Sequence, residues 1–138
     1  MTKRVALTAA VLASLFIYTG SAQAEVKITI PFDFSVGKVL LPSGTYTISK
    51  MGAAQTLLQI RNNDVAVGVI EHPHVVELGH GQVSEADKLV FHRYGDRYFL
   101  AQFWFAGSTR GCEFRRSKVE VEIENASKPR TEVLTASR

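Results

Sequence analysis

The chain has 138 residues, of which 46% are hydrophobic and 21% charged, enough for a single domain with a modest core. Its 16 basic and 13 acidic side chains give a formal net charge of +3. Lys3 and Arg4 lie in the N-terminal segment discussed next, and without them the net charge is +1, which does not indicate nucleic acid or an anionic membrane as a partner. The single cysteine, Cys112, cannot form a disulfide within the chain, so it is either a packed thiol or one that pairs with another molecule.

The first 24 residues follow the order of regions found in a secretory signal peptide. Lys3 and Arg4 precede an apolar run at 5–17, and the small-residue sequence Ala22-Gln23-Ala24 comes after it. Because the run is shorter than the roughly 20 residues of a membrane-spanning helix, cleavage after Ala24 is favoured over an uncleaved anchor. We therefore expect a periplasmic or extracellular protein whose mature chain begins at Glu25 and has no transmembrane segment.

Residues 26–36 alternate between apolar and polar side chains, which predicts a strand with one buried face. Pro31 cannot donate a hydrogen bond to a neighbouring strand, so this strand should lie at a sheet edge or break its pairing there. Asp33 falls on the polar face, where solvation accounts for it. Gly37-Lys38 and residues 41–44 then predict turns.

Three more short strands are predicted at 45–50, 56–61 and 65–71, the last two joined as a hairpin by Asn62-Asn63-Asp64. The side chains expected to face inward are Tyr46, Ile48, Leu58 and Ile60. A short extended piece at 75–77 and a polar loop at 79–87 follow.

Residues 87–105 hold the largest concentration of apolar side chains and are interpreted as a central β-hairpin. Gly95-Asp96 suits the two-residue loop of a type II′ turn, since glycine accepts the positive φ of the first position. An unbroken ladder from this turn places Val90 opposite Ala101. It puts His92, Phe99, Phe103 and Phe105 on one face, and Phe91, Leu100 and Trp104 on the other. Because both faces are apolar, we expect one on the main core and the other beneath another segment.

Residues 117–125 fit two interpretations. Their β-branched residues alternate with glutamates, which favours a strand. Ser117 and Glu120 also have the spacing of a helix capping box, so a short helix stays open. The polar residues 127–138 predict a flexible tail, leaving one β-rich domain over residues 25–126.

The fold predicted from these elements is mainly β: an antiparallel barrel or sandwich of about 7–8 short strands, ending in a strand or a short helix. Three motifs, IPFDFxVG at 30–37, LPxGxY at 41–46 and RYGDRYFL at 93–100, resemble a family of short exported bacterial proteins of unknown function. Ser43 stands where alanine is expected in that family. The resemblance spans nearly all of the mature chain and implies export and a β-rich domain, but no activity.

His72-Pro73-His74 is the best candidate for a metal site. The residue before a proline favours extended backbone, so both imidazoles would face one way, with Cα atoms roughly 6–7 Å apart. With His80 or His92 as a third ligand, this pair could hold zinc or copper. The competing interpretation is an exposed corner between a strand and a loop, in keeping with the neighbouring Glu71 and Glu77.

Other chemistry has less support. Arg110, Arg115 and Arg116 could lower the pKa of the Cys112 thiol if they lie close, yet no base accompanies it. No glycine-rich phosphate loop opens a helix, so a nucleotide is not indicated. The hairpin aromatics could stack on sugars or bases but are more typical of a core; they are Phe91, Tyr94, Tyr98, Phe99 and Trp104.

The sequence therefore predicts an exported β-domain without catalytic residues that acts by binding or by structure at the cell envelope. One alternative is a small barrel that encloses an apolar ligand beside Phe99 and Phe103. The other is a metal-binding protein that uses His72 and His74.

Overall fold

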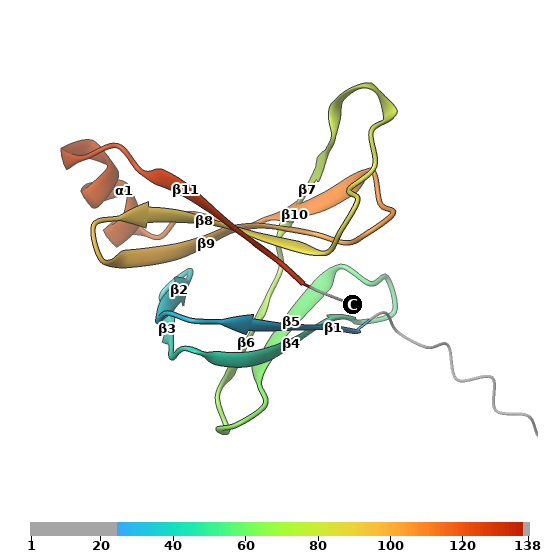
Figure 1. Cartoon of the computed structure of the whole chain (residues 1–138), viewed down its shortest axis with the longest axis horizontal. Helices are drawn as coiled ribbons and strands as arrows, with labels where there is room; N and C mark the ends of the chain where they lie inside the picture. Colours follow the sequence, from blue (N-terminus) through green and yellow to red (C-terminus); the bar gives the residue numbers. More distant parts are fainter. Residues whose placement is uncertain (1–24, 137–138) are drawn as a thin grey trace, which may run out of the picture.

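The computed structural model describes residues 25–136, which form two β-sheets stacked face to face with a short helix at one end (Figure 1). The predicted signal peptide, residues 1–24, lies outside the described residues. Within residues 25–136, no helix is long and apolar enough to cross a membrane.

The first sheet has four antiparallel strands in the order β1-β4-β5-β6. Their bounds are β1 Glu25–Ile30, β4 Gly44–Met51, β5 Leu57–Asn62 and β6 Gly68–Glu71. The second sheet has seven strands along the path β11-β8-β9-β10-β7, with β2 parallel to β9 and antiparallel to β3. Their bounds are β2 Phe34–Val36, β3 Val39–Leu41, β7 His74–Glu77, β8 Lys88–Tyr94, β9 Arg97–Trp104, β10 Arg110–Glu113 and β11 Arg130–Thr135. The helix α1 spans Lys118–Ala126, and a 3₁₀ turn spans Gly79–Gly81.

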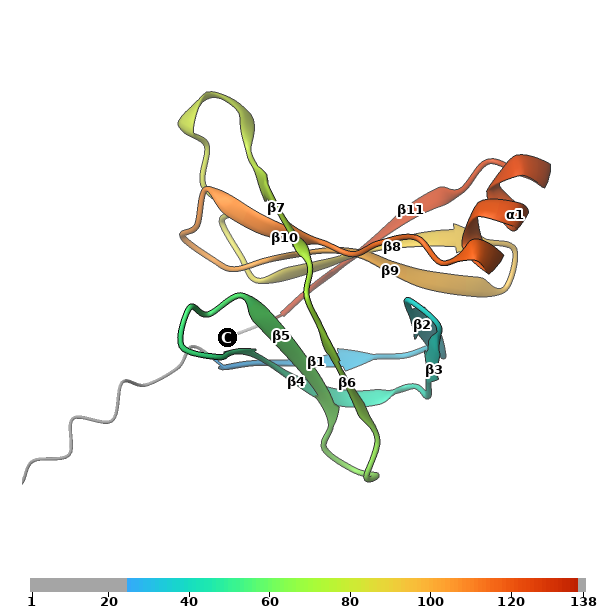
Figure 2. The same cartoon turned by 180° about the vertical axis from the view of Figure 1, so that it is seen from behind.

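The chain passes between the sheets three times, and a proline lies at each crossing: Pro31 between β1 and β2, Pro42 between β3 and β4, and Pro73 between β6 and β7. Pro31 ends β1, an edge strand of the first sheet, and the same alternating segment resumes as β2 in the second sheet. Pro73, which is buried, separates β6 from β7 where the chain crosses again (Figure 2). The prediction of an edge strand broken at Pro31 is thus confirmed, although the segment 26–36 serves two sheets instead of one.

The space between the sheets is filled by apolar side chains from both. Tyr46, Ile48, Leu58 and Ile60, predicted to face inward, are at most 1% exposed. From the second sheet come Phe34, Leu89, Phe91 and Phe103, each fully buried. Burial of each large apolar side chain stabilises the fold by roughly 1.5–3 kcal/mol.

The central hairpin forms as predicted near its turn. Gly95 adopts φ +60° and Asp96 keeps a negative φ, as a type II′ turn requires. Further along, a β-bulge between Val90 and Phe91 places Val90 opposite Gln102 instead of Ala101. The extra residue reverses the alternation, so the predicted faces are wrong beyond this point. Phe103 and Phe105 join the core with Phe91 and Leu100, and Trp104 lies on the opposite face with Phe99.

The strand favoured for 117–125 is wrong, because this segment is the helix α1. Ser117 is its N-cap, and its hydroxyl accepts a hydrogen bond from the backbone N–H of Glu120 at 3.2 Å. The alternating Val119 and Val121 are exposed, whereas Glu120 is buried. The capping residues, not the β-branched alternation, therefore decide this element.

The flexible tail predicted for 127–138 is also wrong over most of its length. Residues Arg130–Thr135 form β11, which pairs antiparallel with β8 along its whole length. Leu134 and Ala136 pack against the core cluster. The edge of β8 supplies the hydrogen-bond partners for this strand. The polar composition of residues 127–138 does not indicate that such an edge is available.

The described residues contain eleven strands, more than the predicted 7–8. Part of the difference is β10, for which no strand is predicted. Its Gly111 lies against Trp104, and a Cβ there would come within 2.6 Å of the indole ring. The two sheets do not close on each other, so the sandwich is the alternative observed and the barrel is not.

Candidate functional site

A buried polar cluster joins α1 to the outer face of the central hairpin. Glu120 is 4% exposed. Its Oε1 accepts a hydrogen bond from the Tyr94 hydroxyl at 3.3 Å and lies 3.2 Å from Nδ1 of His92. Each group in this cluster has a partner, as buried polar groups require. Glu120 therefore fixes the helix on the sheet.

Burial and the neighbouring carboxylate of Glu120 raise the pKa of the Tyr94 hydroxyl to about 12. The nearby Arg116, which precedes α1, forms an ion pair with Glu124 of the helix. The Tyr94 ring also packs edge-on against Phe99, with centroids 5.7 Å apart. The cluster is thus occupied by contacts that hold α1, and it connects through Phe99 to the open groove beside it.

This groove, which we call the α1 groove, lies between the β2–β3 turn, the start of β9 and the first turn of α1. Figures 1 and 2 place these three parts at the same end of the molecule. Its volume is about 390 Å³. Apolar side chains in its lining are Leu40, Phe99 and Val119, and charged ones are Lys38, Arg97 and Lys118.

The three cations of the α1 groove are exposed, and none forms an ion pair with a carboxylate in the part of the chain that the structure describes. The Arg97 guanidinium lies 5.4 Å from the centroid of the Phe99 ring, which keeps its charge above an apolar surface. The groove thus combines apolar side chains with three cations, which we call its positive rim.

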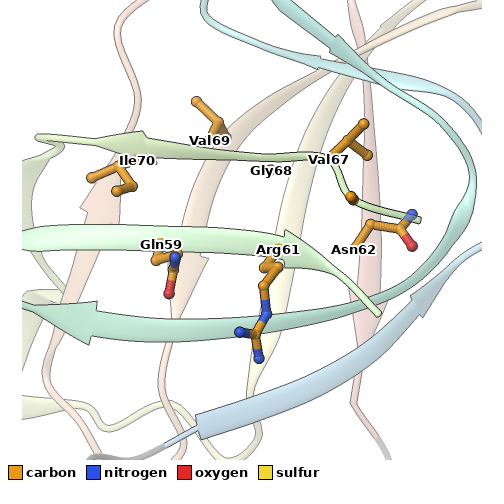
Figure 3. A pocket seen from close by; sticks show the side chains of 8 residues that line it. Gln59, Arg61, Asn62, Val67, Gly68, Val69 and Ile70 are labelled. Carbon is orange, nitrogen blue, oxygen red and sulfur yellow. The ribbon is translucent and has the colours of Figure 1, made fainter. Parts of the chain in front are cut away.

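A second hollow, of about 490 Å³, lies on the β5–β6 hairpin (Figure 3). Gln59, Arg61 and Ile70 lie on one side of this strand pair and Val69 on the other. Asn62 is committed to the hairpin turn, because its Oδ1 accepts hydrogen bonds from two backbone N–H groups. This hollow is built from a single hairpin and has one cation, so it offers fewer recognition groups than the α1 groove.

The predicted metal ligands lie in different settings. His72 precedes the crossing at Pro73, His74 belongs to β7, and His80 lies in the 3₁₀ turn. Nε2 of His74 accepts a hydrogen bond from Arg115 at 3.0 Å, and His92 faces Glu120 instead. Within residues 25–136, no three side chains of His, Cys, Asp or Glu are grouped to hold a metal ion. The zinc or copper site remains a prediction with no such cluster behind it.

Cys112 lies in β10, partly buried against the core. Burial raises the pKa of its thiol, and Lys50 offsets this only in part. The nucleophilic thiolate that neighbouring arginines could have produced is therefore not supported. The hairpin aromatics also have internal partners: Tyr98 stacks on Phe32 with centroids 3.6 Å apart, and Phe91 is in the core.

Sequence reasoning did not identify the α1 groove. Lys38, Arg97 and Lys118 come from three separate elements, and no local motif links them. The one usable signal was the capping pair Ser117 and Glu120, which indicated the helix that forms one wall.

Comparisons with protein-family models, with curated proteins and with solved structures find no match.

Proposed function

We propose that this protein is an exported, non-catalytic binding domain of the cell envelope, with the α1 groove as its ligand site. The observation that carries the proposal is the exposed apolar surface in the groove, where Leu40 is 70% and Val119 46% exposed beside Phe99. A volume of about 390 Å³ falls in the range of about 300–1,000 Å³ typical of small-molecule sites. Apolar surface left open in a concave site favours an apolar ligand.

The polar groups near the groove support binding rather than catalysis. Glu120 is a buried carboxylate of the kind that can act as a general base, but it is held by Tyr94 and His92 beneath α1. A general base has to reach a substrate proton directly or through one water. Glu120 is buried away from solvent and already bonded, so its role is to position the helix.

Export is supported by the order of residues 1–24. Two basic residues, an apolar run and a small-residue sequence follow one another there as in a secretory signal peptide. N-terminal sequencing of the protein recovered from the periplasm or the medium is expected to begin at Glu25. Recovery of only full-length chain in the cytoplasm would contradict this part of the proposal.

An uncharged environment-sensitive dye such as Nile red tests the groove directly. Leu40→Ser and Val119→Ser are expected to weaken dye binding several-fold, because each removes apolar surface from the site. Val75→Ser is the matched control, since Val75 is 68% exposed on β7, outside the groove. Equal losses in all three variants, with unchanged thermal midpoints, would place the binding elsewhere and refute the α1 groove as the site.

A further inference from the structure

We infer that the α1 groove selects a single-chain anionic amphiphile, a free fatty-acid anion, with its carboxylate at the positive rim and its hydrocarbon chain on Leu40, Phe99 and Val119. This inference rests on the proposed function and adds the chemical class of the ligand. It goes beyond apolar binding because the three cations select the charge of the ligand's head group.

The charges of the rim argue for an anionic head group. Lys38, Arg97 and Lys118 meet around one groove, although the mature chain is nearly neutral overall. Two arginines near α1 and β11 are already paired with carboxylates, Arg116 with Glu124 and Arg93 with Glu132. Cations gathered without a carboxylate partner repel one another, and an anion between them relieves that repulsion.

One carboxylate does lie at an end of the groove. Glu71 Oε1 comes close to Gly37, and burial raises the pKa of the Glu71 carboxyl. The Gly37 end is therefore the less suitable place for a second carboxylate. Arg97 and Lys118, on β9 and α1, are the better partners for the head group. The hydrocarbon chain of the ligand then lies over Leu40.

The shape and the surroundings favour a monomeric ligand over a membrane surface. The groove is walled by a hairpin turn and a helix end, whereas a bilayer presents a broad face. Beyond Lys118, α1 exposes Glu122, and Glu124 is half-buried beside it. Acidic groups on this helix would be repelled by an anionic leaflet, but they do not obstruct one molecule in the groove.

The test compares three twelve-carbon amphiphiles with different heads: laurate, dodecanol and dodecyltrimethylammonium. Each is titrated into the mature protein below its micelle-forming concentration or, for dodecanol, below its solubility limit, with displacement of Nile red as the readout. We expect laurate to bind about tenfold more tightly than dodecanol, and the ammonium compound to bind most weakly. The preference for laurate should shrink as salt is added.

The charge variant is the triple substitution Lys38→Gln, Arg97→Gln and Lys118→Gln. It should weaken laurate binding about tenfold and leave dodecanol binding unchanged. The control is Lys27→Gln, Lys128→Gln and Arg130→Gln, which removes the same charge from exposed positions outside the groove and should leave laurate binding unchanged. If the triple variant has a lowered thermal midpoint, Lys38→Gln with Lys118→Gln keeps Arg97 on Phe99 and should still cost about threefold.

The outcomes separate this inference from the proposed function. Equal binding of laurate and dodecanol, or equal losses in the groove and control triples, overturns the anionic preference and leaves apolar binding in place. Cosedimentation with phosphatidylglycerol vesicles, without binding of monomeric laurate, also overturns the inference in favour of a membrane surface. Absence of any dye binding that depends on Leu40 refutes the proposed function itself.

Discussion

At the residue scale, Glu120 decides how the C-terminal part of the chain is arranged. A carboxylate is costly to bury unless hydrogen bonds compensate it, and here Tyr94 and His92 supply them. The same contacts hold the first turn of α1 against the hairpin, which sets Lys118 and Val119 at the wall of the groove. One buried acid thus connects folding to the proposed ligand site.

The raised pKa of Tyr94 predicts how stability depends on alkaline pH. In the unfolded chain this hydroxyl ionises near pH 10, whereas in the folded protein it stays neutral until about pH 12. The unfolded state therefore gains from ionisation first, and stability falls as pH rises from about 10 to 12. Urea unfolding across this interval should show the loss.

Tyr94→Phe is the control for that titration, because it removes the ionising hydroxyl and keeps the ring against Phe99. It is expected to show a shallower fall over the same interval. The pKa of Tyr46 is also raised, so some alkaline loss should remain in the variant. Identical pH profiles for the two proteins would contradict the assignment to Tyr94.

At the element scale, the first turn of α1 outweighs the β-branched pattern that follows it. The Ser117 hydroxyl satisfies the free N–H of Glu120, one of the amides that a helix start leaves without a partner. A strand in this position would expose Glu120 or bury it without its partners. The capping pair and the buried acid therefore act in the same direction.

Ser117→Ala is expected to lower the free energy of unfolding by about 1 kcal/mol, because it removes the N-cap hydrogen bond. Ser127→Ala, at the exposed C-terminal end of the same helix, is the control and should change it by less than about 0.5 kcal/mol. Chemical denaturation measures both. A control variant as destabilised as Ser117→Ala would show that the cap contributes nothing specific.

At the scale of the whole molecule, β11 is the edge strand that covers β8 in the second sheet. It pairs with β8 and brings Leu134 onto the core cluster between the sheets. A chain ending at residue 129 should lose about 2 kcal/mol or more of unfolding free energy, since it loses this pairing and this burial. A chain ending at residue 136 keeps β11 and serves as the control; equal thermal midpoints would contradict this role.

Much of the sandwich could be predicted from local sequence alone. The inward residues of β4 and β5, the break at Pro31 and the turn at Gly95-Asp96 follow from alternation and turn chemistry, which act between neighbours in the chain. The bulge beside Val90, the strand β11 and the helix α1 were predicted wrongly or left open. The bulge and β11 depend on partners distant in the sequence, and at α1 the local cap acts together with the distant partners of Glu120.

The sequence by itself determined that the chain is mainly β, because side-chain period and turn residues are properties of a few consecutive positions. Tertiary structure alone decided the α1 groove. Lys38, Arg97 and Lys118 line one groove only because the β2–β3 turn, β9 and α1 meet at one end of the sandwich. That meeting depends on the pairing of β2 with β9 after the break at Pro31 and on the burial of Glu120 against Tyr94 and His92, which are contacts between residues distant in the sequence.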